Sequence, residues 1–200
     1  METEVLKGDP ILRAAQALSI ALGERDMYTR HHCNRVTSLA TELGNACGLQ
    51  GSRLEQMRVA ATFHDVGKIG VPDAVLLKPS KLTAEEWELM KAHSEKGENI
   101  FRGTTLPDVE VLASIIRHHH ESFDGSGYPD GLRGEQIPVS CRILLIVDCY
   151  DAMTTVRPYS KARSHAEAMG ILLKERGAKV DPQVLSVFAR LIEHSEQRAH

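Results

Sequence analysis

Histidine and aspartate residues are grouped at several points of this 200-residue chain, which contains ten histidines. His64 and Asp65 are adjacent, and so are His119 and His120. An isolated His-Asp pair is also compatible with a helix-end cap beside a surface charge, but the repetition of such groups favours a metal site. The candidate ligands are His32, His64, Asp65, His93, His119, His120 and Asp148.

Imidazole and carboxylate ligands without thiolate point to iron, manganese or zinc rather than to a structural zinc site of the cysteine type. Seven candidates are too many for one ion, whereas two ions bridged by a carboxylate and a hydroxide would use them well. Such a pair serves in-line displacement at phosphorus, because both ions neutralise charge on the phosphoryl oxygens. Asp148 supports this interpretation, since an unpaired charge in the apolar run from Leu144 to Tyr150 would be costly.

The elements that position these side chains are predicted to be helical, because apolar residues recur at helical spacing and no segment alternates strictly. Helix starts are indicated by the Asp-Pro pairs at 9–10 and 181–182 and by capping boxes at Ser52–Glu55, Thr83–Glu86 and Ser164–Glu167. The expected helices cover about 10–22, 30–47, 52–63, 83–93, 109–119, 139–154, 164–177 and 181–195. Residues 67–82 and 122–138 are predicted to be non-helical. The fold class is therefore all-α, a compact single-domain helical bundle with two long functional loops.

The composition excludes several classes of protein. The net charge of −3 argues against a broad basic surface that would coat a polynucleotide. The longest apolar runs, such as Ile143 to Val147, are too short to span a membrane, and residues 1–4 lack the basic start of a secretory signal. The four cysteines form no C-x-x-C pair, so we expect reduced thiols and a cytoplasmic protein.

Two sequence motifs carry a specific resemblance. Residues His64 to Lys68 read His-Asp-Val-Gly-Lys, and His119-His120-Glu121 is followed by Asp124-Gly-Ser-Gly-Tyr-Pro129. Both resemble the motifs of the HD-GYP family, a branch of the HD phosphohydrolases, and the match extends from about Asp26 to Pro182. The resemblance implies a bundle of the HD phosphohydrolase type. We predict a helical lead-in over residues 1–24 and an HD-GYP domain over residues 25–200.

The resemblance also implies roles for individual residues. The seven candidates above match the metal ligands of the family, with Asp65 as the bridging carboxylate that acts in catalysis. Lys68 matches a catalytic lysine that contacts the substrate phosphate, and Arg157 matches an arginine with the same contact. Tyr128 is expected to contact substrate, and the loop Gly127-Tyr128-Pro129 is expected to shape the site and to offer a surface to partner proteins.

Several positions depart from the family pattern, including Ser80 and Ser122-Phe123 in the loops. Tyr28 stands where some members have a glutamate that holds a third metal, so we expect two ions, iron or manganese. Cys33 replaces a common serine beside His32. His31 precedes His32, so either histidine could be the ligand that points inward, and the register of the following residues favours His32. Ser160 replaces a frequent basic residue, so we expect part of the phosphate contact either to be weaker or to shift to Lys161.

The function implied is hydrolysis of cyclic di-GMP to pGpG, with further cleavage to GMP, by attack of a metal-bridging hydroxide. Two alternatives stay open: a catalytically silent cyclic di-GMP sensor or interaction module, and a hydrolase of another cyclic dinucleotide. The expected protein partner at the Gly-Tyr-Pro loop is of the GGDEF-domain kind, and a homodimer is compatible with the sequence. Neither a polynucleotide nor a membrane is expected as a partner.

Residues close to the candidate ligands have less specific interpretations. Asp151 is predicted to cap a helix or to support a ligand rather than to bind metal. Glu121 is expected either to orient His120 or to be a plain surface carboxylate, and Cys149 is expected to be a packed thiol. The other histidines, His118, His165, His194 and His200, are expected to be solvated or to lie beside the ligands without binding metal.

Overall fold

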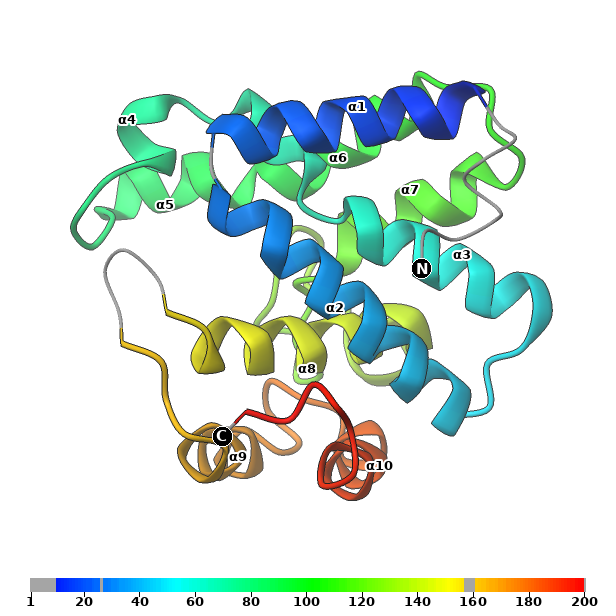
Figure 1. Cartoon of the computed structure of the whole chain (residues 1–200), viewed down its shortest axis with the longest axis vertical. Coiled ribbons are helices and arrows are strands. Elements are labelled where there is room, and N and C mark those ends of the chain that lie inside the picture. Colours follow the sequence, from blue (N-terminus) through cyan, green and yellow to red (C-terminus); the bar gives the residue numbers. More distant parts are fainter. Residues whose placement is uncertain (1–9, 26, 157–160, 200) are drawn as a thin grey trace.

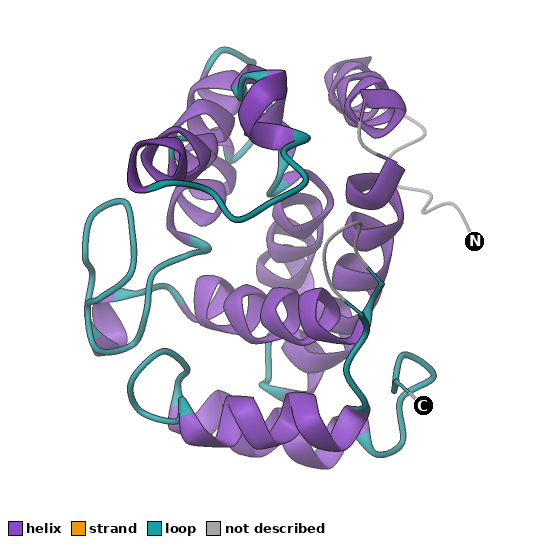
Figure 2. Cartoon of the chain, turned by 90° about the vertical axis from the view of Figure 1, so that its left-hand side faces the viewer, coloured by secondary structure: helices purple, strands orange, loops and turns teal. Residues whose placement is uncertain are grey.

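The structure is a computed structural model that describes residues 10–25, 27–156 and 161–199. Its α-helices are α1 (Pro10–Arg25), α2 (Met27–Ala46), α3 (Gly51–Phe63), α4 (Asp73–Leu76), α5 (Ala84–Lys91), α6 (His93–Arg102), α7 (Val109–His118), α8 (Val139–Thr154), α9 (His165–Lys174) and α10 (Pro182–Ile192). Two 3₁₀-helices, η2 (Val66–Gly70) and η3 (Gly134–Gln136), lie in the loops. The described parts contain no strand, only an isolated bridge between Arg176 and Val180 (Figure 2). The all-α prediction is confirmed.

The bundle is organised around α2, which runs diagonally across the molecule in Figure 1 and packs against α1, α3, α8 and α10. On the other side of α3, α7 packs against both α3 and α6. The core between these helices is formed by fully buried apolar side chains such as Leu43, Phe63, Ile116 and Ile146. Helix α8 has buried residues from Ser140 to Asp151, as expected for a helix with a long apolar stretch in the centre of the bundle.

Most of the predicted helix starts are confirmed. Thr83 and Glu86 form a capping box at α5, and Ser164 and Glu167 form another at α9. The carboxylate of Asp181 accepts hydrogen bonds from the first turn of α10, with a proline as the first helical residue.

The third predicted capping box is wrong. Helix α3 begins at Gly51 with Gln50 as its N-cap, so Ser52 lies inside the helix and caps nothing. Glu55 instead pairs with Arg58 one turn further along the same helix. The same four-residue pattern therefore marks a helix start only when the preceding residue is not already helical.

Three further boundaries differ from the prediction. The helix expected over about 83–93 is two helices, because the chain bends at Ala92 and α6 begins at His93. The stretches 67–82 and 122–138 are not wholly non-helical, since they contain η2, α4 and η3 as single turns. Helix α2 begins at Met27, so His32 lies in its second turn rather than at its start.

The contact of η2 with α6 depends on a glycine. A Cβ atom at Gly67 would lie 1.9 Å from the carbonyl oxygen of His93 and 2.5 Å from the backbone nitrogen of Gly97. Both partners are backbone atoms, so no side chain can move aside. Only glycine therefore lets the His-Asp segment lie directly against the start of α6.

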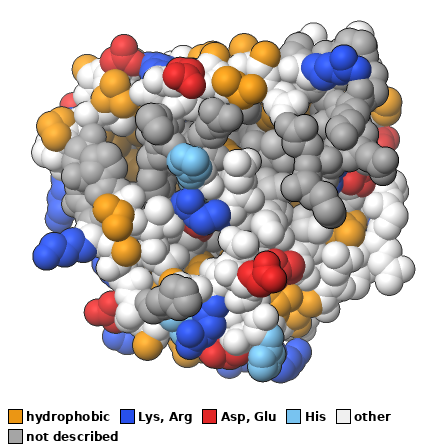
Figure 3. Space-filling view, in the orientation of Figure 1, with side chains coloured by type: hydrophobic (Ala, Val, Ile, Leu, Met, Phe, Trp, Pro, Cys, Tyr) orange, Lys and Arg blue, Asp and Glu red, His pale blue; other side chains and the backbone are white. Residues whose placement is uncertain are grey.

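None of the helices in the described ranges is long and apolar enough to cross a membrane. On the face drawn in Figure 3, acidic and basic side chains are interspersed rather than gathered by sign.

Candidate metal centre

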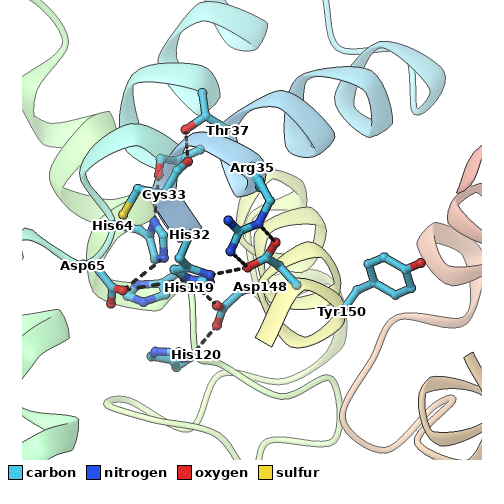
Figure 4. Close-up of polar contacts among 12 residues, drawn as sticks. His32, Cys33, Arg35, Thr37, His64, Asp65, His119, His120, Asp148 and Tyr150 are labelled. Carbon is cyan, nitrogen blue, oxygen red and sulfur yellow. Dashed lines mark hydrogen bonds and ion pairs between the residues drawn. The ribbon is translucent and has the colours of Figure 1, made fainter. Parts of the chain in front are cut away.

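The seven predicted ligands come from five segments of the chain and lie together in the interior, and Figure 4 labels six of them, all but His93. His32 is on α2, His64 follows the last residue of α3, and Asp65 precedes η2. His93 opens α6, His119 and His120 follow α7, and Asp148 is on α8. Five of them are buried, while His120 and Asp148 retain partial exposure. The centre is therefore buried on most sides and open at His120 and Asp148.

The ligand atoms form two groups. His32, His64 and Asp148, here called group A, offer atoms that all lie within 4.8 Å of one another. His93, His119 and His120, here called group B, meet the same condition.

Asp65 lies between the two groups. Its Oδ2 is 3.7 Å from His64 Nε2 and 3.9 Å from His32 Nε2, both in group A. Its Oδ1 is 3.6 Å from His93 Nε2, in group B. One carboxylate therefore presents a separate oxygen to each group.

Three of the histidines are oriented by backbone carbonyl groups. The Nδ1 atoms of His64, His93 and His119 lie 2.7, 2.8 and 2.6 Å from the carbonyl oxygens of the residues three positions earlier. A carbonyl oxygen only accepts, so each Nδ1 carries the proton and each Nε2 presents a lone pair. All three lone pairs point into the centre.

Two contacts among these lone pairs are unfavourable without a cation. His64 Nε2 is buried and has no hydrogen bond. His93 Nε2 and His119 Nε2 are 3.3 Å apart, although neither neutral ring has a proton to donate there. One divalent ion at His64 and another at His93 and His119 would satisfy all three nitrogens, so the residues fit the metals that the family resemblance implies.

Electrostatics keep group B neutral. Burial lowers the pKa of His93 to about 4 and that of His120 to about 3. Burial, reinforced by the neighbouring imidazoles, also lowers the pKa of His119. Neutral imidazole is the form that binds metal, so group B is prepared for an ion at physiological pH.

His32 is held by a carboxylate on its outer side. Its Nδ1 lies 2.7 Å from Asp151 Oδ2, and Arg35 donates to both oxygens of that carboxylate at 2.6 and 3.0 Å. Burial alone would lower the pKa of His32, but hydrogen bonds to Asp148 and Asp151 raise it to about 9. As predicted, Asp151 contacts a candidate ligand, and its role in supporting metal binding stays a prediction. Arg35 was not predicted to take part, although it lies three residues after His32 and so on the same helix face.

Lys68 donates to Asp65 Oδ2 at 2.7 Å and is one-fifth exposed. Burial would raise the pKa of the Asp65 carboxyl, but Lys68 and the surrounding histidines hold it well below its usual range. The backbone that carries Lys68 is bound by the last residue of α1. Arg25 donates to the carbonyl oxygens of Lys68 and Ile69 at 3.2 and 3.0 Å and forms an ion pair with Asp73.

An aromatic group lies beside His120. The ring of Tyr128 lies against that of His120 with a centroid distance of 4.9 Å and a tilt of 34°, and Trp87 approaches Tyr128 edge-on at 6.2 Å. Lys91 lies 5.8 Å from the centroid of the Tyr128 ring. Trp87 is 46% exposed and was not singled out from the sequence as a site residue, because a tryptophan on an amphipathic helix reads as core.

The loop that carries Tyr128 is fixed by a buried carboxylate. Glu121 is 1% exposed and accepts from the backbone N–H groups of Asp130, Gly131 and Leu132 at 2.7, 3.1 and 3.1 Å. Both interpretations of Glu121 are therefore wrong, since it is neither the partner of His120 nor a surface carboxylate.

The remaining candidates fall outside the centre or outside the described part. Arg157 and His200 are not among the described residues, and nor is the side chain of Tyr28. Lys161 is exposed in the segment before α9. His31 is exposed while His32 is buried, which confirms the choice by register.

His165 corrects the prediction that it is solvated. It is 8% exposed, with Nδ1 2.8 Å from the Tyr150 hydroxyl and Nε2 3.0 Å from Glu193. The tyrosine and the glutamate are distant in sequence, so no local pattern indicated this burial. His194 is exposed as expected, and His118 binds Asp130 at 2.8 Å.

Comparison with known proteins agrees with this geometry. Residues 11–184 match the family described as HD domain. The chain belongs to the HD domain family. The sequence-based assignment is thus confirmed.

Two curated relatives illustrate the match. The "Cyclic di-GMP phosphodiesterase response regulator RpfG" of Xanthomonas campestris pv. campestris (strain 8004) is 37% identical over 189 residues, 94% of this chain and 49% of the relative. The "3'3'-cGAMP-specific phosphodiesterase 2" of Vibrio cholerae serotype O1 is 34% identical over 180 residues, 90% of this chain and 34% of the relative. This HD domain thus spans about half the length, or less, of these relatives.

A solved structure agrees in fold. The HD-GYP-type protein Bd1817 from Bdellovibrio bacteriovorus superposes with a TM-score of 0.65 at 22% identity, covering 90% of this chain and 57% of that one.

Proposed function

We propose that this HD domain is a metal-dependent phosphodiesterase that hydrolyses cyclic di-GMP to pGpG and then to GMP. The observation that carries the proposal is the position of Asp65, whose two oxygens face groups A and B separately. A carboxylate in this position suits two ions held side by side, which is the arrangement that phosphoryl transfer uses. The name of the Xanthomonas relative supports the choice of substrate.

The residues of group A would hold one ion, those of group B the other, and Asp65 both. Bound there, the ions supply a hydroxide near neutral pH and neutralise charge on the phosphoryl oxygens. Iron or manganese suits this set of imidazoles and carboxylates. Asp151 accepts a hydrogen bond from His32 Nδ1, and this contact directs the other ring nitrogen, Nε2, inward.

Lys68 would bind the substrate phosphate. Its ammonium group reaches Asp65 now, and the same position is within reach of a phosphoryl oxygen in the centre. In the reaction, water adds to phosphorus, the P–O3′ bond breaks, and the 3′ oxygen takes a proton, which leaves a 5′ phosphate. The extra charge on phosphorus is stabilised by Lys68 and, we predict, by Arg157 and Lys161. Tyr128, which lies against His120, borders the open side where substrate enters.

A second substrate is favoured by a specific observation. One relative is named for 3'3'-cGAMP. The residues of groups A and B would act on the phosphate of a substrate and do not select its base. Parallel assays with cyclic di-GMP, 3'3'-cGAMP and cyclic di-AMP would rank these substrates. A rate with 3'3'-cGAMP above that with cyclic di-GMP would transfer the proposal to that nucleotide.

The test of the main proposal joins metal content to turnover. Protein purified without chelators and reloaded with iron(II) or manganese(II) should contain close to two ions per chain and release pGpG. The double variant His64→Ala, Asp65→Ala should keep its helical circular dichroism and lose turnover. Tight cyclic di-GMP binding without hydrolysis would make the protein a sensor instead.

Three further expectations stay predictions. They are a cytoplasmic location, in line with four free cysteines, a homodimer, and a GGDEF-domain type of partner at the loop Gly127-Tyr128-Pro129.

A further inference from the structure

A third set of potential ligands includes a cysteine. Ligand atoms of Cys33, His64 and Asp65 all lie within 4.8 Å of one another. Cys33 follows His32 on α2 and is partly buried, and Figure 4 shows its sulfur on the side of His64 and Asp65. A thiolate and an imidazole bound to one ion at about 2.3 and 2.0 Å lie up to about 4.3 Å apart, a separation that falls inside the 4.8 Å limit that these atoms meet.

A second observation points to a ligand at this place. His64 Nε2 is buried and has no hydrogen bond, and the ligand atom of this ring lies within 4.8 Å of the Cys33 sulfur. Its ring is fixed by the 2.7 Å contact between Nδ1 and the Ala61 carbonyl oxygen, so it cannot turn to another partner.

We propose that Cys33 is a thiolate ligand of the ion bound at His64 and Asp65. The thiol releases its proton to solvent when the ion binds, and a sulfur–metal bond forms. Lys68, which donates to Asp65 at 2.7 Å, offsets part of the negative charge that a second anionic ligand brings. The inference rests on the proposed metal centre and adds a ligand to it.

A thiolate changes which metal the centre prefers. Sulfur is a soft ligand and favours zinc, iron and cobalt over manganese and magnesium. The ion in group A should therefore be iron or zinc more often than the ion in group B, whose ligands are imidazoles and the Asp65 carboxylate, with no thiolate.

Cobalt(II) provides the test, because a thiolate bound to it gives a charge-transfer band in the near ultraviolet that imidazole and carboxylate do not give. The full chain, stripped of metal and titrated with cobalt(II) alone, should develop this band with the first equivalents bound. Cys33→Ser should lose the band while still binding cobalt. The matched control is Cys149→Ser. It removes a thiol that is next to Asp148 in the chain and hydrogen-bonded to Lys179, and it should keep the band.

A second measurement needs no variant. The zinc-loaded wild-type protein should show a sulfur scatterer at about 2.3 Å in X-ray absorption. A band that survives in Cys33→Ser, a band lost only in Cys149→Ser, or a zinc spectrum with nitrogen and oxygen alone would overturn the proposal. A protein that binds no cobalt would overturn it together with the metal centre.

These results are distinguishable from the fate of the proposed function. A cobalt band that depends on Cys33, in a protein that does not hydrolyse cyclic di-GMP, would retain this ligand and reject the phosphodiesterase. Hydrolysis of cyclic di-GMP by a protein without the cobalt band would retain the phosphodiesterase and reject Cys33 as a ligand.

Discussion

At the residue scale, the centre is defined by hydrogen bonds on the outer side of four of its histidines. Carbonyl oxygens fix His64, His93 and His119, and a carboxylate fixes His32. These contacts set which ring nitrogen faces inward before any ion arrives. The ligands are therefore arranged in advance, which lowers the ordering cost of binding.

The support of His32 can be tested by Asp151→Asn. The amide accepts less strongly from His32 Nδ1 and also loses the ion pair with Arg35. We expect metal affinity to fall about 10–100-fold, as for other partners of metal-bound histidines. Titration with a metal-competing dye measures the change. Glu110→Gln, an exposed carboxylate on α7, is the control and should leave affinity unchanged.

Lys68→Gln tests the phosphate contact. The glutamine keeps hydrogen-bonding capacity but removes the charge that stabilises the transition state. We expect kcat to fall about 10²–10³-fold, equivalent to about 3–4 kcal/mol, with the metal content per chain unchanged. A fall confined to KM would place Lys68 in ground-state binding and contradict the assigned role.

At the element scale, the centre depends on how closely η2 approaches α6. Gly67→Ala introduces a methyl group 1.9 Å from a backbone oxygen, so the two elements must separate. We expect a loss of at least about 1–3 kcal/mol in the free energy of unfolding and a loss of bound metal. Urea denaturation measures the first quantity.

Gly170→Ala is the matched control for that substitution. Gly170 lies within α9, where an added Cβ meets nothing within 4 Å. Here alanine should stabilise the protein by about 0.5–1 kcal/mol, because it only lowers the entropy of the unfolded chain. Equal effects at the two positions would show that the close approach of η2 does not matter.

Local patterns predicted the elements well and the long-range contacts poorly. The capping boxes at Thr83 and Ser164 could be predicted because both partners are three residues apart. Glu121 could not, since its partners are backbone N–H groups nine to eleven positions later, in a loop without periodicity. The seven ligands were found by residue type and family resemblance, but their division into two groups appears only when the helices are packed.

At the scale of the whole molecule, the stability of the metal-free protein should depend on pH in two opposite ways. His93 and His120 have folded pKa values of about 4 and about 3, below their ordinary 6.5, so the unfolded chain binds more protons and stability falls as pH drops below 6.5. His32 has a folded pKa of about 9, so its contribution is complete below 6.5 and is lost as pH rises through 9.

The metal-free protein should therefore be most stable near pH 6.5, at the ordinary histidine pKa. Urea unfolding in the presence of a chelator, repeated from acid to alkaline pH, gives the profile. A steady rise in stability through pH 9 would contradict the role given to His32. Saturating metal should raise the whole curve, by about 2.7 kcal/mol at a free concentration 100 times Kd.

The contact between His32 and Asp151 joins positions 119 residues apart in the chain. A loop of that length must close before the contact can form. The chain therefore loses conformational entropy before the contact stabilises the fold. Each helix of the bundle can form from neighbouring residues, but group A exists only after α2 has docked on α8. A chain with all of its helices formed but α8 undocked would therefore lack Asp148 as a ligand and the Asp151 contact that orients His32, and metal uptake would report the docking of α8.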